Sequence, residues 1–374
     1  SGITVSPDGQ TVLFTVRSTD FEKDGGTTDL WSVPATGGEP RRLTTHPAAD
    51  HSGAWTPDGK AVLFLSSRSG SSQVWKIRMS GGEALQITDL PLGVNGFLQS
   101  PAGDQLALAL EVFPDCDTLQ CTTDRLEARA SGKVSGRIYD SLFIRHWDTW
   151  KDGRRSHLFV MPVQGGDPRD LMTGMNADSP SKPFGGMEEV AFTPDGTGLV
   201  FTARQGKGEA WSTDLDLYLA PVDGSAEPRV LTPDNDAVDT NPVFSPDGGS
   251  LAWLAMERPG FEADRRRILL RSWPDGETKV LAGGWDRSPN SLTWSEDGKT
   301  IYATASDLGN VSLFSISVPR GKVRRLVTGG SVRSPSRSGD RLFYGLETFR
   351  SPVEIFSSNL KGDDVRTLTR INQD

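Results

Sequence analysis

Two adjacent glutamates, Glu188 and Glu189, form an acidic pair that could bind a cation. Paired carboxylates can hold a cationic group, such as the α-amino group of a peptide, through charge-assisted hydrogen bonds. Adjacent residues of a strand point to opposite faces, so the two carboxylates converge only if this stretch is irregular or helical. The preceding Gly185-Gly186 permits such a conformation. The alternative is a pair of solvated acids at the start of a strand.

A second group of candidates lies between Arg137 and Arg155, in the string RIYDSLFIRHWDTWKDGRR. Aromatic and arginine side chains are enriched in the cores of interfaces. This composition predicts contact with a substrate or a partner, and the alternative is an extended segment that packs on its own sheet. The candidate contact residues are Tyr139, Arg145, His146, Trp147 and Trp150. His146 alone does not indicate catalysis, because a catalytic histidine needs a nucleophile beside it.

The two cysteines, Cys116 and Cys121, lie shortly before this string. We interpret them as a disulfide that closes a small loop in an oxidising compartment. The alternative is two free thiols in a loop. No further Cys or His lies nearby in the sequence to complete a metal site, so we expect neither a metal ion nor another cofactor.

Motifs for several other kinds of chemistry are absent from the sequence. There is no Gly-x-Ser-x-Gly nucleophile elbow, no phosphate-binding glycine loop and no dinucleotide fingerprint. We therefore expect no catalytic residues in this chain. The net charge of −9 argues against nucleic acid as a partner. No apolar run reaches the ~18 residues that a membrane span needs, so we expect no membrane contact.

A turn motif of the form Ser/Thr-Pro-Asp-Gly, with degenerate copies, recurs along the whole chain. Proline presets φ at the first corner, aspartate tolerates the second, and glycine supplies the positive φ that reverses the chain. Alternating apolar residues flank the turns, as in Val12–Val16, so each copy predicts two strands joined by a tight turn. The seven copies begin at Ser6, Thr56, Ser100, Thr193, Ser245, Ser295 and Ser336.

A second motif alternates with the first. It is an apolar or aromatic strand, a glycine-containing turn and a short strand that ends near Leu-Thr. Its seven copies are Asp29–Thr44, Gln73–Thr88, His157–Met172, Asp216–Thr232, Ile268–Leu281, Ser312–Val327 and Glu354–Thr369. Four-stranded units that repeat roughly every 40–50 residues are typical of propeller blades.

The two motifs together predict an all-β fold, a single seven-bladed β-propeller of four-stranded antiparallel blades over residues 1–374. No strand is left over to complete a neighbouring blade, so we expect the first and last blades to meet through side-chain packing. The predicted blades are approximately 1–45, 46–89, 90–173, 174–232, 233–282, 283–328 and 329–370, with a long insertion at 112–156 in the third.

The irregular segments fall together in this scheme. In a blade, the turns between the first and second strands and between the third and fourth lie at one end, and the remaining connections lie at the other. The insertion at 112–156 and the long connector at 173–189 both belong to the second set. Variable loops on a rigid scaffold often carry binding residues, so this sector is the predicted site. The alternative is that long loops are simply tolerated.

The sequence resembles the propellers of the prolyl oligopeptidase family of serine peptidases. Its turns and its GG…LT strand ends also occur in TolB-like propellers and are weakly specific. The string RIYDSLFIRHWDTWKDGRRSHLFV, preceded by a Cys-x4-Cys loop, is similar to the branch of bacterial dipeptidyl-peptidase V and acylaminoacyl-peptidase-like members. PFGGMEEVAFTPDG and AWSTDLDLY resemble the same branch, so the resemblance covers essentially the whole chain.

Members of this family carry a C-terminal α/β-hydrolase domain with a Ser-Asp-His triad, and the propeller restricts entry to short peptides. In dipeptidyl-peptidase relatives, a glutamate pair of the propeller holds the substrate's amino terminus, and the resemblance assigns that role to Glu188 and Glu189. It implies a non-catalytic domain that gates and binds substrate in a periplasmic or secreted serine exopeptidase. The implied partners are the hydrolase domain, short peptides and, for the parent enzyme, a second copy of itself.

The ends of the chain fit this interpretation. The sequence begins without Met and stops at Asp374, where the hydrolase domain would begin. We therefore expect a fragment, or one chain, of a longer enzyme. The alternative is a stand-alone TolB-like interaction propeller.

Overall fold

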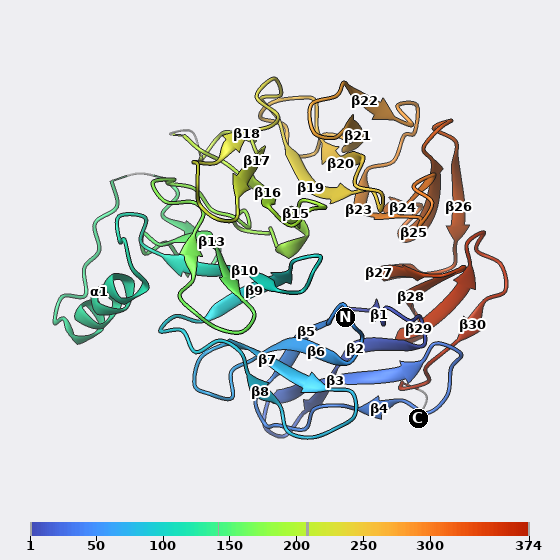
Figure 1. Cartoon of the computed structure of the whole chain (residues 1–374), viewed down its shortest axis with the longest axis horizontal. Coiled ribbons are helices and arrows are strands. Elements are labelled where there is room, and N and C mark those ends of the chain that lie inside the picture. Colours follow the sequence, from blue (N-terminus) through green and yellow to red (C-terminus); the bar gives the residue numbers. More distant parts are fainter. Residues whose placement is uncertain (1, 141, 207–208, 373–374) are drawn as a thin grey trace. The chain divides into compact units, whose positions relative to one another are not determined.

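The computed structural model describes residues 2–140, 142–206 and 209–372. Within these residues, seven antiparallel sheets of four strands follow one another along the chain (Figure 1). The chain is a seven-bladed β-propeller, as the repeats predict. The described residues also contain a helix that the sequence motifs do not predict, α1 (Leu119–Ser131), and one turn of 3-10 helix, η1 (Met187–Glu189).

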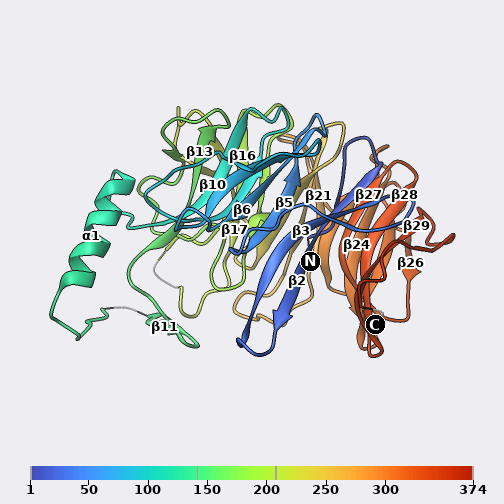
Figure 2. The same ribbon diagram turned by 90° about the horizontal axis from the view of Figure 1, so that it is seen from below.

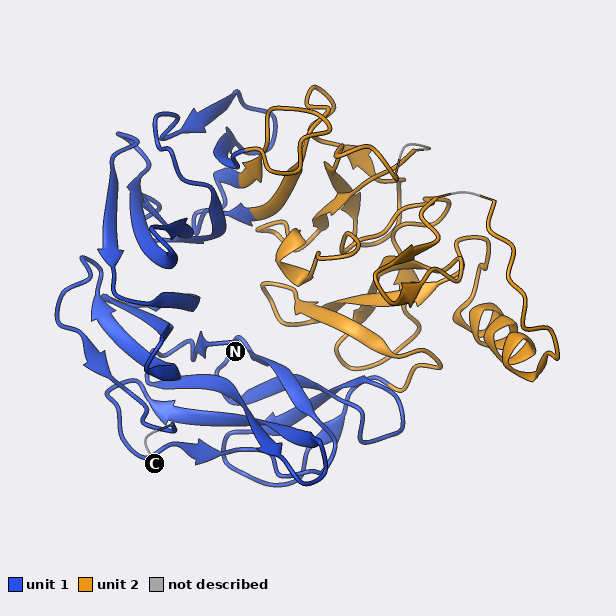
Figure 3. Cartoon of the chain, turned by 180° about the vertical axis from the view of Figure 1, so that it is seen from behind, with its two compact units in different colours: residues 1–88, 243–252, 265–374 blue, residues 89–242, 253–264 orange. Residues whose placement is uncertain are grey.

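Unit 1, blue in Figure 3, contains residues 1–88, 243–252 and 265–374 and holds the first, second, sixth and seventh sheets. The first sheet is β1 (Thr4–Val5), β2 (Thr11–Asp20), β3 (Gly25–Pro34) and β4 (Arg41–Arg42). The second is β5 (Asp50–Trp55), β6 (Ala61–Ser66), β7 (Gln73–Arg78) and β8 (Leu85–Gln86). The sixth is β23 (Pro289–Trp294), β24 (Thr300–Asp307), β25 (Asn310–Ser317) and β26 (Val323–Val327). The seventh is β27 (Ser331–Ser338), β28 (Arg341–Thr348), β29 (Ser351–Asn359) and β30 (Arg366–Thr367).

Unit 2, orange in Figure 3, contains residues 89–242 and 253–264 and holds the third and fourth sheets. The third is β9 (Val94–Gln99), β10 (Gln105–Val112), β13 (Arg155–Pro162) and β14 (Arg169–Asp170). The fourth is β15 (Val190–Phe192), β16 (Gly198–Ala203), β17 (Asp216–Pro221) and β18 (Arg229–Val230). The two units share the fifth sheet, which is β19 (Asp239–Phe244), β20 (Ser250–Ala255), β21 (Arg267–Ser272) and β22 (Thr278–Leu281).

The insertion of the third sheet lies between β10 and β13. It contains α1 and a two-stranded ribbon of β11 (Arg145–His146) and β12 (Thr149–Trp150). Figure 2 shows α1 standing away from β10 and β13 of its own sheet. Only Thr122 of this helix is buried, so α1 contributes little to the core.

The repeated turns are closed by the side chains that define their motif. The Ser6 hydroxyl donates to Asp8 Oδ1 at 2.5 Å, and the same oxygen accepts the backbone N–H of Gln10 at 3.0 Å. Gly9 adopts a φ of 73°, which a residue with a Cβ rarely tolerates. The same hydroxyl-to-carboxylate bond forms in Thr56–Asp58, Thr193–Asp195, Ser245–Asp247 and Ser295–Asp297. These aspartates are therefore structural.

The core lies between the faces of successive sheets. Every residue of β6 and of β16 is buried, so these strands pack on both faces. In unit 2, Phe201 of β16 stacks on Tyr218 of β17 at 5.8 Å between ring centroids, in a cluster that also includes Leu158 of the third sheet. A fully buried side chain of this size contributes roughly 1.5–3 kcal/mol. Adjacent sheets thus stabilise one another, as repeat folds require.

The first and last sheets, both in unit 1, pack together in the same way. Val12 and Val33 of the first sheet share a buried cluster with Phe343 and Ile355 of the seventh. In the described residues, each sheet is built from its own strands, and the two sheets share none. The cluster of buried side chains therefore joins the first and last sheets without a common strand.

The turn geometry makes a direct prediction at Gly298, whose φ is +66° and whose Cβ would meet open space. Gly298→Ala should lower the free energy of unfolding by about 1–2 kcal/mol, because only backbone strain is added. Chemical denaturation measures this change. The control is Gly249→Ala, where the Cβ makes ordinary contacts no closer than 3.5 Å and φ is outside the left-handed region. An equal loss in both variants would contradict the role given to the turn glycine.

Candidate functional site

One end of unit 2 carries the insertion, the long connector and η1. Val112 pairs with Arg155, so the insertion leaves and re-enters the third sheet at the same end. The connector leads into η1 and then directly into β15. Met187 of η1 packs over β9, since a Cβ on Gly96 would lie 2.7 Å from the Met187 side chain. The three segments therefore meet at one end of the third and fourth sheets.

The predicted glutamate pair lies in η1. A helical turn is one of the conformations in which the two adjacent carboxylates could point the same way. Glu189 is only 7% exposed. Its carboxylate accepts the backbone N–H of Ser181 at 2.7 Å, the Ser181 hydroxyl at 2.8 Å and the Thr240 hydroxyl at 3.3 Å. Burial, together with the nearby charge of Glu188, raises the pKa of Glu189 against the opposite effect of these hydrogen bonds. Glu189 is thus an internal carboxyl group.

Glu188 lies in a different environment, because its side chain is exposed. Its carboxylate folds back over Gly186, where a Cβ would lie 2.5 Å from Glu188 Oε2. Any side chain on Gly186 would therefore displace this carboxylate. Of the two predicted ligands, Glu188 is the one that presents its charge to solvent.

The predicted aromatic residues gather on the ribbon of β11 and β12. Arg145 pairs with Trp150 across the ribbon, and its guanidinium lies 5.6 Å from the centroid of the Trp150 ring. Tyr139 contacts the same ring at 6.0 Å between centroids. His146 contacts the ring of Phe143 at 4.4 Å, and in the described part of the chain no nucleophile is hydrogen-bonded to it.

Trp147, at the tip of the ribbon, connects the two predicted groups of residues. Its ring lies 5.5 Å from the ring of Phe184, which directly precedes Gly185-Gly186. Both rings are 75% exposed. The insertion therefore contacts the connector at Phe184, which lies four residues before the exposed Glu188 in the sequence. Phe184 was not among the predicted residues, although its place before the two glycines could have suggested it.

Comparisons with known proteins agree with the propeller fold. Residues 3–111 match the TolB beta propeller domain family. Over its whole length, the chain is 30% identical to dipeptidyl-peptidase 5 of Porphyromonas gingivalis and covers 54% of that protein. The chain is a β-propeller domain of the prolyl oligopeptidase family. It spans about half the length of the curated relatives it matches.

Solved structures support the fold of this prolyl oligopeptidase family propeller. Acylaminoacyl peptidase of Pyrococcus horikoshii aligns with a TM-score of 0.70 and 15% identity, over 99% of this chain and 52% of that one. The propeller domain of the Trilobed protease of Pyrococcus furiosus aligns with a TM-score of 0.67 and 11% identity, over 100% and 98% of the two chains. At these identities the likeness concerns the fold alone.

A cluster of ion pairs anchors the base of the aromatic ribbon in this family member. Glu209, in the loop between β16 and β17, accepts hydrogen bonds from Lys151 at 2.5 Å and from two nitrogens of Arg155 at 3.0 Å. Arg155 also pairs with Asp178 of the connector at 2.8 Å. Burial acts to raise the pKa of Glu209, but the bonds from Arg155 and Lys151 prevail and lower it to about 2. The sequence analysis missed this cluster, because its members lie far apart along the chain.

The other half of the insertion is held by different contacts. Cys116 and Cys121 form a disulfide that ties the loop to the first turn of α1. The guanidinium groups of Arg125 and Arg129 lie 4.5 and 4.6 Å from the ring centroid of Phe113, at the end of the third sheet. These contacts hold α1 in place although it buries little apolar surface.

Asp239 is another buried acid of unit 2 and directly precedes Thr240, the partner of Glu189. It accepts the indole N–H of Trp253 at 2.5 Å and the amide of Asn235 at 2.8 Å. Burial raises the pKa of Asp239 to about 7, despite these two hydrogen bonds. No motif distinguished this aspartate in the sequence.

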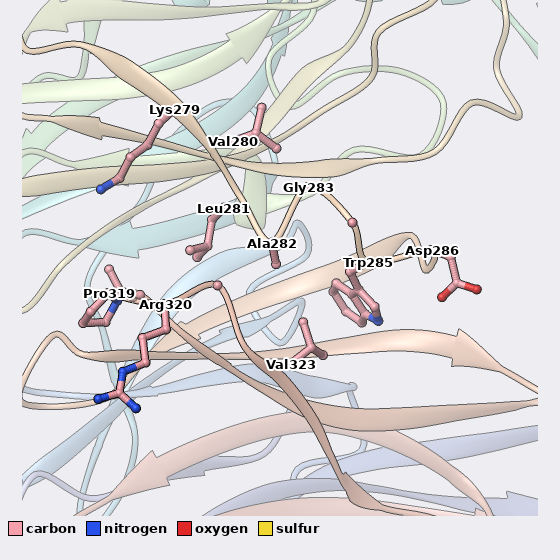
Figure 4. A pocket seen from close by; sticks show the side chains of 13 residues that line it. Lys279, Val280, Leu281, Ala282, Gly283, Trp285, Asp286, Pro319, Arg320 and Val323 are labelled. Carbon is pink, nitrogen blue, oxygen red and sulfur yellow. The ribbon is translucent and has the colours of Figure 1, made fainter.

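A hollow also lies outside this sector. In unit 1, a hollow of about 600 Å³ lies between residues 279–286 and 318–323, with Lys279 and Arg320 opposite Trp285 and Asp286 (Figure 4). It contains none of the predicted residues. Across residues 2–140, 142–206 and 209–372, no group of three or more potential ligands could hold a metal ion. No helix in the same residues is long and apolar enough to span a membrane.

The ion-pair cluster predicts that Glu209→Gln loosens the aromatic ribbon. A neutral amide loses the charge that attracts Lys151 and Arg155, so chymotrypsin should cleave at Tyr139–Trp150 several times faster than in the wild type. Glu227→Gln, at an exposed turn of the same sheet, is the control. In the wild type, the depressed pKa of Glu209 means that its contribution persists above pH 4.5 and is lost as the pH falls towards 2. Equal cleavage rates in the two variants would contradict the anchoring role.

The raised pKa of Asp239 predicts a pH effect on stability. The folded state keeps this proton up to about pH 7, whereas the unfolded chain releases it near pH 3.8. The contribution of Asp239 is therefore fully present below pH 3.8 and falls as the pH rises to 7. Asp239→Asn should remove this part of the pH dependence. The free energy of unfolding of the variant should therefore rise relative to that of the wild type between pH 5 and pH 7.5. Urea unfolding at both pH values measures the two free energies, and an unchanged difference between them would refute the assignment.

Proposed function

We propose that this propeller is the non-catalytic domain that gates and binds substrate in a serine exopeptidase of the dipeptidyl-peptidase or acylaminoacyl-peptidase type. The observation that carries the proposal is the contact of Trp147 with Phe184, two exposed aromatic rings that join the insertion to the connector shortly before the exposed Glu188 in the sequence. Exposed aromatic rings and a carboxylate are groups that suit the side chains and the amino terminus of a short peptide. The relation to dipeptidyl-peptidase 5 over the whole chain supports the same function.

The catalytic groups would come from another domain. The sequence has no Gly-x-Ser-x-Gly motif, and the chain covers about half of its curated relatives. The proposed partner is an α/β-hydrolase domain in the same protein or in a separate chain, and the proposed substrates are short peptides. A dimer of the parent enzyme is a further part of the proposal. A periplasmic or secreted location is also proposed, and the disulfide between Cys116 and Cys121 supports it.

A stand-alone interaction propeller is the second candidate. The match of residues 3–111 to the TolB beta propeller domain is the observation that favours it. In this case the aromatic ribbon would contact a protein partner instead of a peptide substrate.

The test compares this chain with the product of its complete reading frame on chromogenic dipeptidyl substrates. Activity is expected only in the complete product. Trp147→Ala in that product should raise KM about tenfold with little change in kcat, because an exposed binding surface is lost and the catalytic groups are not touched. Phe349→Ala, which removes an exposed aromatic ring of unit 1, is the matched control.

Three other outcomes would change the proposed function. No activity in either form would favour the interaction propeller. Activity in the isolated chain would contradict the non-catalytic role. Equal KM values for Trp147→Ala and Phe349→Ala would remove the aromatic ribbon from the proposed substrate site.

A further inference from the structure

The hollow of unit 1 lies between two backbone segments that approach each other closely. One segment is β22 with the connector that follows it, up to Asp286, and the other is the turn from Val318 to Val323 between β25 and β26. A Cβ on Gly321 would lie 3.3 Å from the backbone nitrogen of Ala282. Ala282 itself has a φ of 52°, which is uncommon for a residue with a Cβ. Strain of this kind is often retained at binding sites.

The indole ring of Trp285 forms an aromatic wall of this hollow. The ring packs edge-on against Phe314 of β25, at 5.0 Å between ring centroids and 60° between ring planes. The backbone N–H of Trp285 donates to the Ala282 carbonyl at 2.8 Å, and its carbonyl oxygen accepts a bond from the guanidinium of Arg265. Because these contacts hold Trp285 from both sides, a ligand that binds its ring loses little affinity to ordering the protein.

The charged side chains that line the hollow are not balanced. Among the described residues that line it, Asp286 is the sole acid, and it forms an ion pair with Arg287 at 2.7 Å. Lys279 and Arg320 lie on the opposite side of the hollow (Figure 4) and are both exposed. Within residues 2–140, 142–206 and 209–372, neither of these two cations forms an ion pair. The hollow therefore carries an excess of positive charge in a chain whose net charge is −9.

The two cations and the aromatic ring together favour one ligand chemistry. A guanidinium group such as that of Arg320 donates two parallel hydrogen bonds to a carboxylate, and the ammonium group of Lys279 adds a compact second charge. The Trp285 ring, with Val280 and Pro319, offers apolar surface for a ring or a branched hydrocarbon group. The volume of about 600 Å³ is in the range of small-molecule sites.

We propose that this hollow binds an organic carboxylate that carries a ring or a branched apolar group. The carboxylate lies between Lys279 and Arg320, and the apolar group lies against Trp285. A free acid and the carboxyl end of a peptide present the same groups, so both are possible sources of the ligand. The site is independent of the proposed peptidase function, because all of its residues belong to unit 1.

The experiment follows Trp285 by fluorine-19 NMR in the product of the complete reading frame, labelled with 5-fluorotryptophan. The Trp285 signal is identified by its absence in Trp285→Phe. The probe is 3-phenylpropanoate, and its neutral amide is the matched control ligand. The acid should shift the Trp285 signal, and the amide should bind about tenfold more weakly or worse, because the charge-assisted bonds are lost.

Three variants separate the two cations from charge in general. Arg320→Gln and Lys279→Gln should each weaken binding of the acid about tenfold and leave binding of the amide unchanged. Arg324→Gln is the control, since Arg324 is an exposed arginine of β26 that does not line the hollow. All three side chains are exposed, so the variants should unfold at the temperature of the wild type.

A second probe distinguishes the two sources of the carboxylate. Acetyl-D-alanyl-phenylalanine should bind more tightly than 3-phenylpropanoate if the hollow takes the carboxyl end of a peptide. Equal or weaker binding of this dipeptide would support a free acid as the ligand.

Four results would overturn the proposal. These are the absence of a shift at Trp285, equal binding of the acid and the amide, wild-type affinity in both Arg320→Gln and Lys279→Gln, and a response to inorganic phosphate as strong as that to the acid. The last result would show a general anion site without selection for an apolar group. If Trp285→Phe does not fold, the comparison of acid with amide in Arg320→Gln and Arg324→Gln still decides.

Discussion

The structure depends on the burial of both faces of its four-stranded sheets. Strands such as β6 and β16 are buried at every position, so one sheet alone would expose a large apolar surface. Packing on neighbouring sheets removes that surface from water. The regular Ser/Thr-Pro-Asp-Gly turns follow from the same constraint, because they keep each strand in register with the next. This packing constrains the strands, so the loops at the ends of the sheets can differ in length and sequence.

Polar contacts fix the loops at the variable end of unit 2. Glu189 fixes the connector through Ser181 and Thr240, and Glu209 fixes the base of the aromatic ribbon through Lys151 and Arg155. Such buried bonds are directional, so they place a loop more specifically than apolar contact does. Between these two anchors, Trp147 contacts Phe184 of the connector. Two carboxylates that are hydrogen-bonded inside the protein thus order the loops on either side of this contact.

The repeats were sufficient to predict the sheets, because each turn carries its own local signal in Pro, Asp and Gly. Strand order determines which connections lie at the same end of a sheet. It could therefore be predicted that the long loops of the third and fourth sheets share one end. The contacts within those loops could not be predicted. Glu209 and Asp178 are distant in sequence from Arg155, and no pattern links them. The unequal burial of Glu188 and Glu189 could not be predicted for the same reason, because Glu189 is hydrogen-bonded to Thr240 in another sheet. Helix α1 was missed because its sequence is mostly polar and shows no apolar stripe.

The most direct test of this account is a crystal structure of the complete enzyme with a bound dipeptide that has a free amino terminus. The account predicts the ammonium nitrogen within about 2.7–3.2 Å of a Glu188 carboxylate oxygen. It also predicts that Glu189 still accepts its bonds from Ser181 and Thr240. An ammonium group bound to Glu189 in place of Ser181, or bound away from η1, would contradict it.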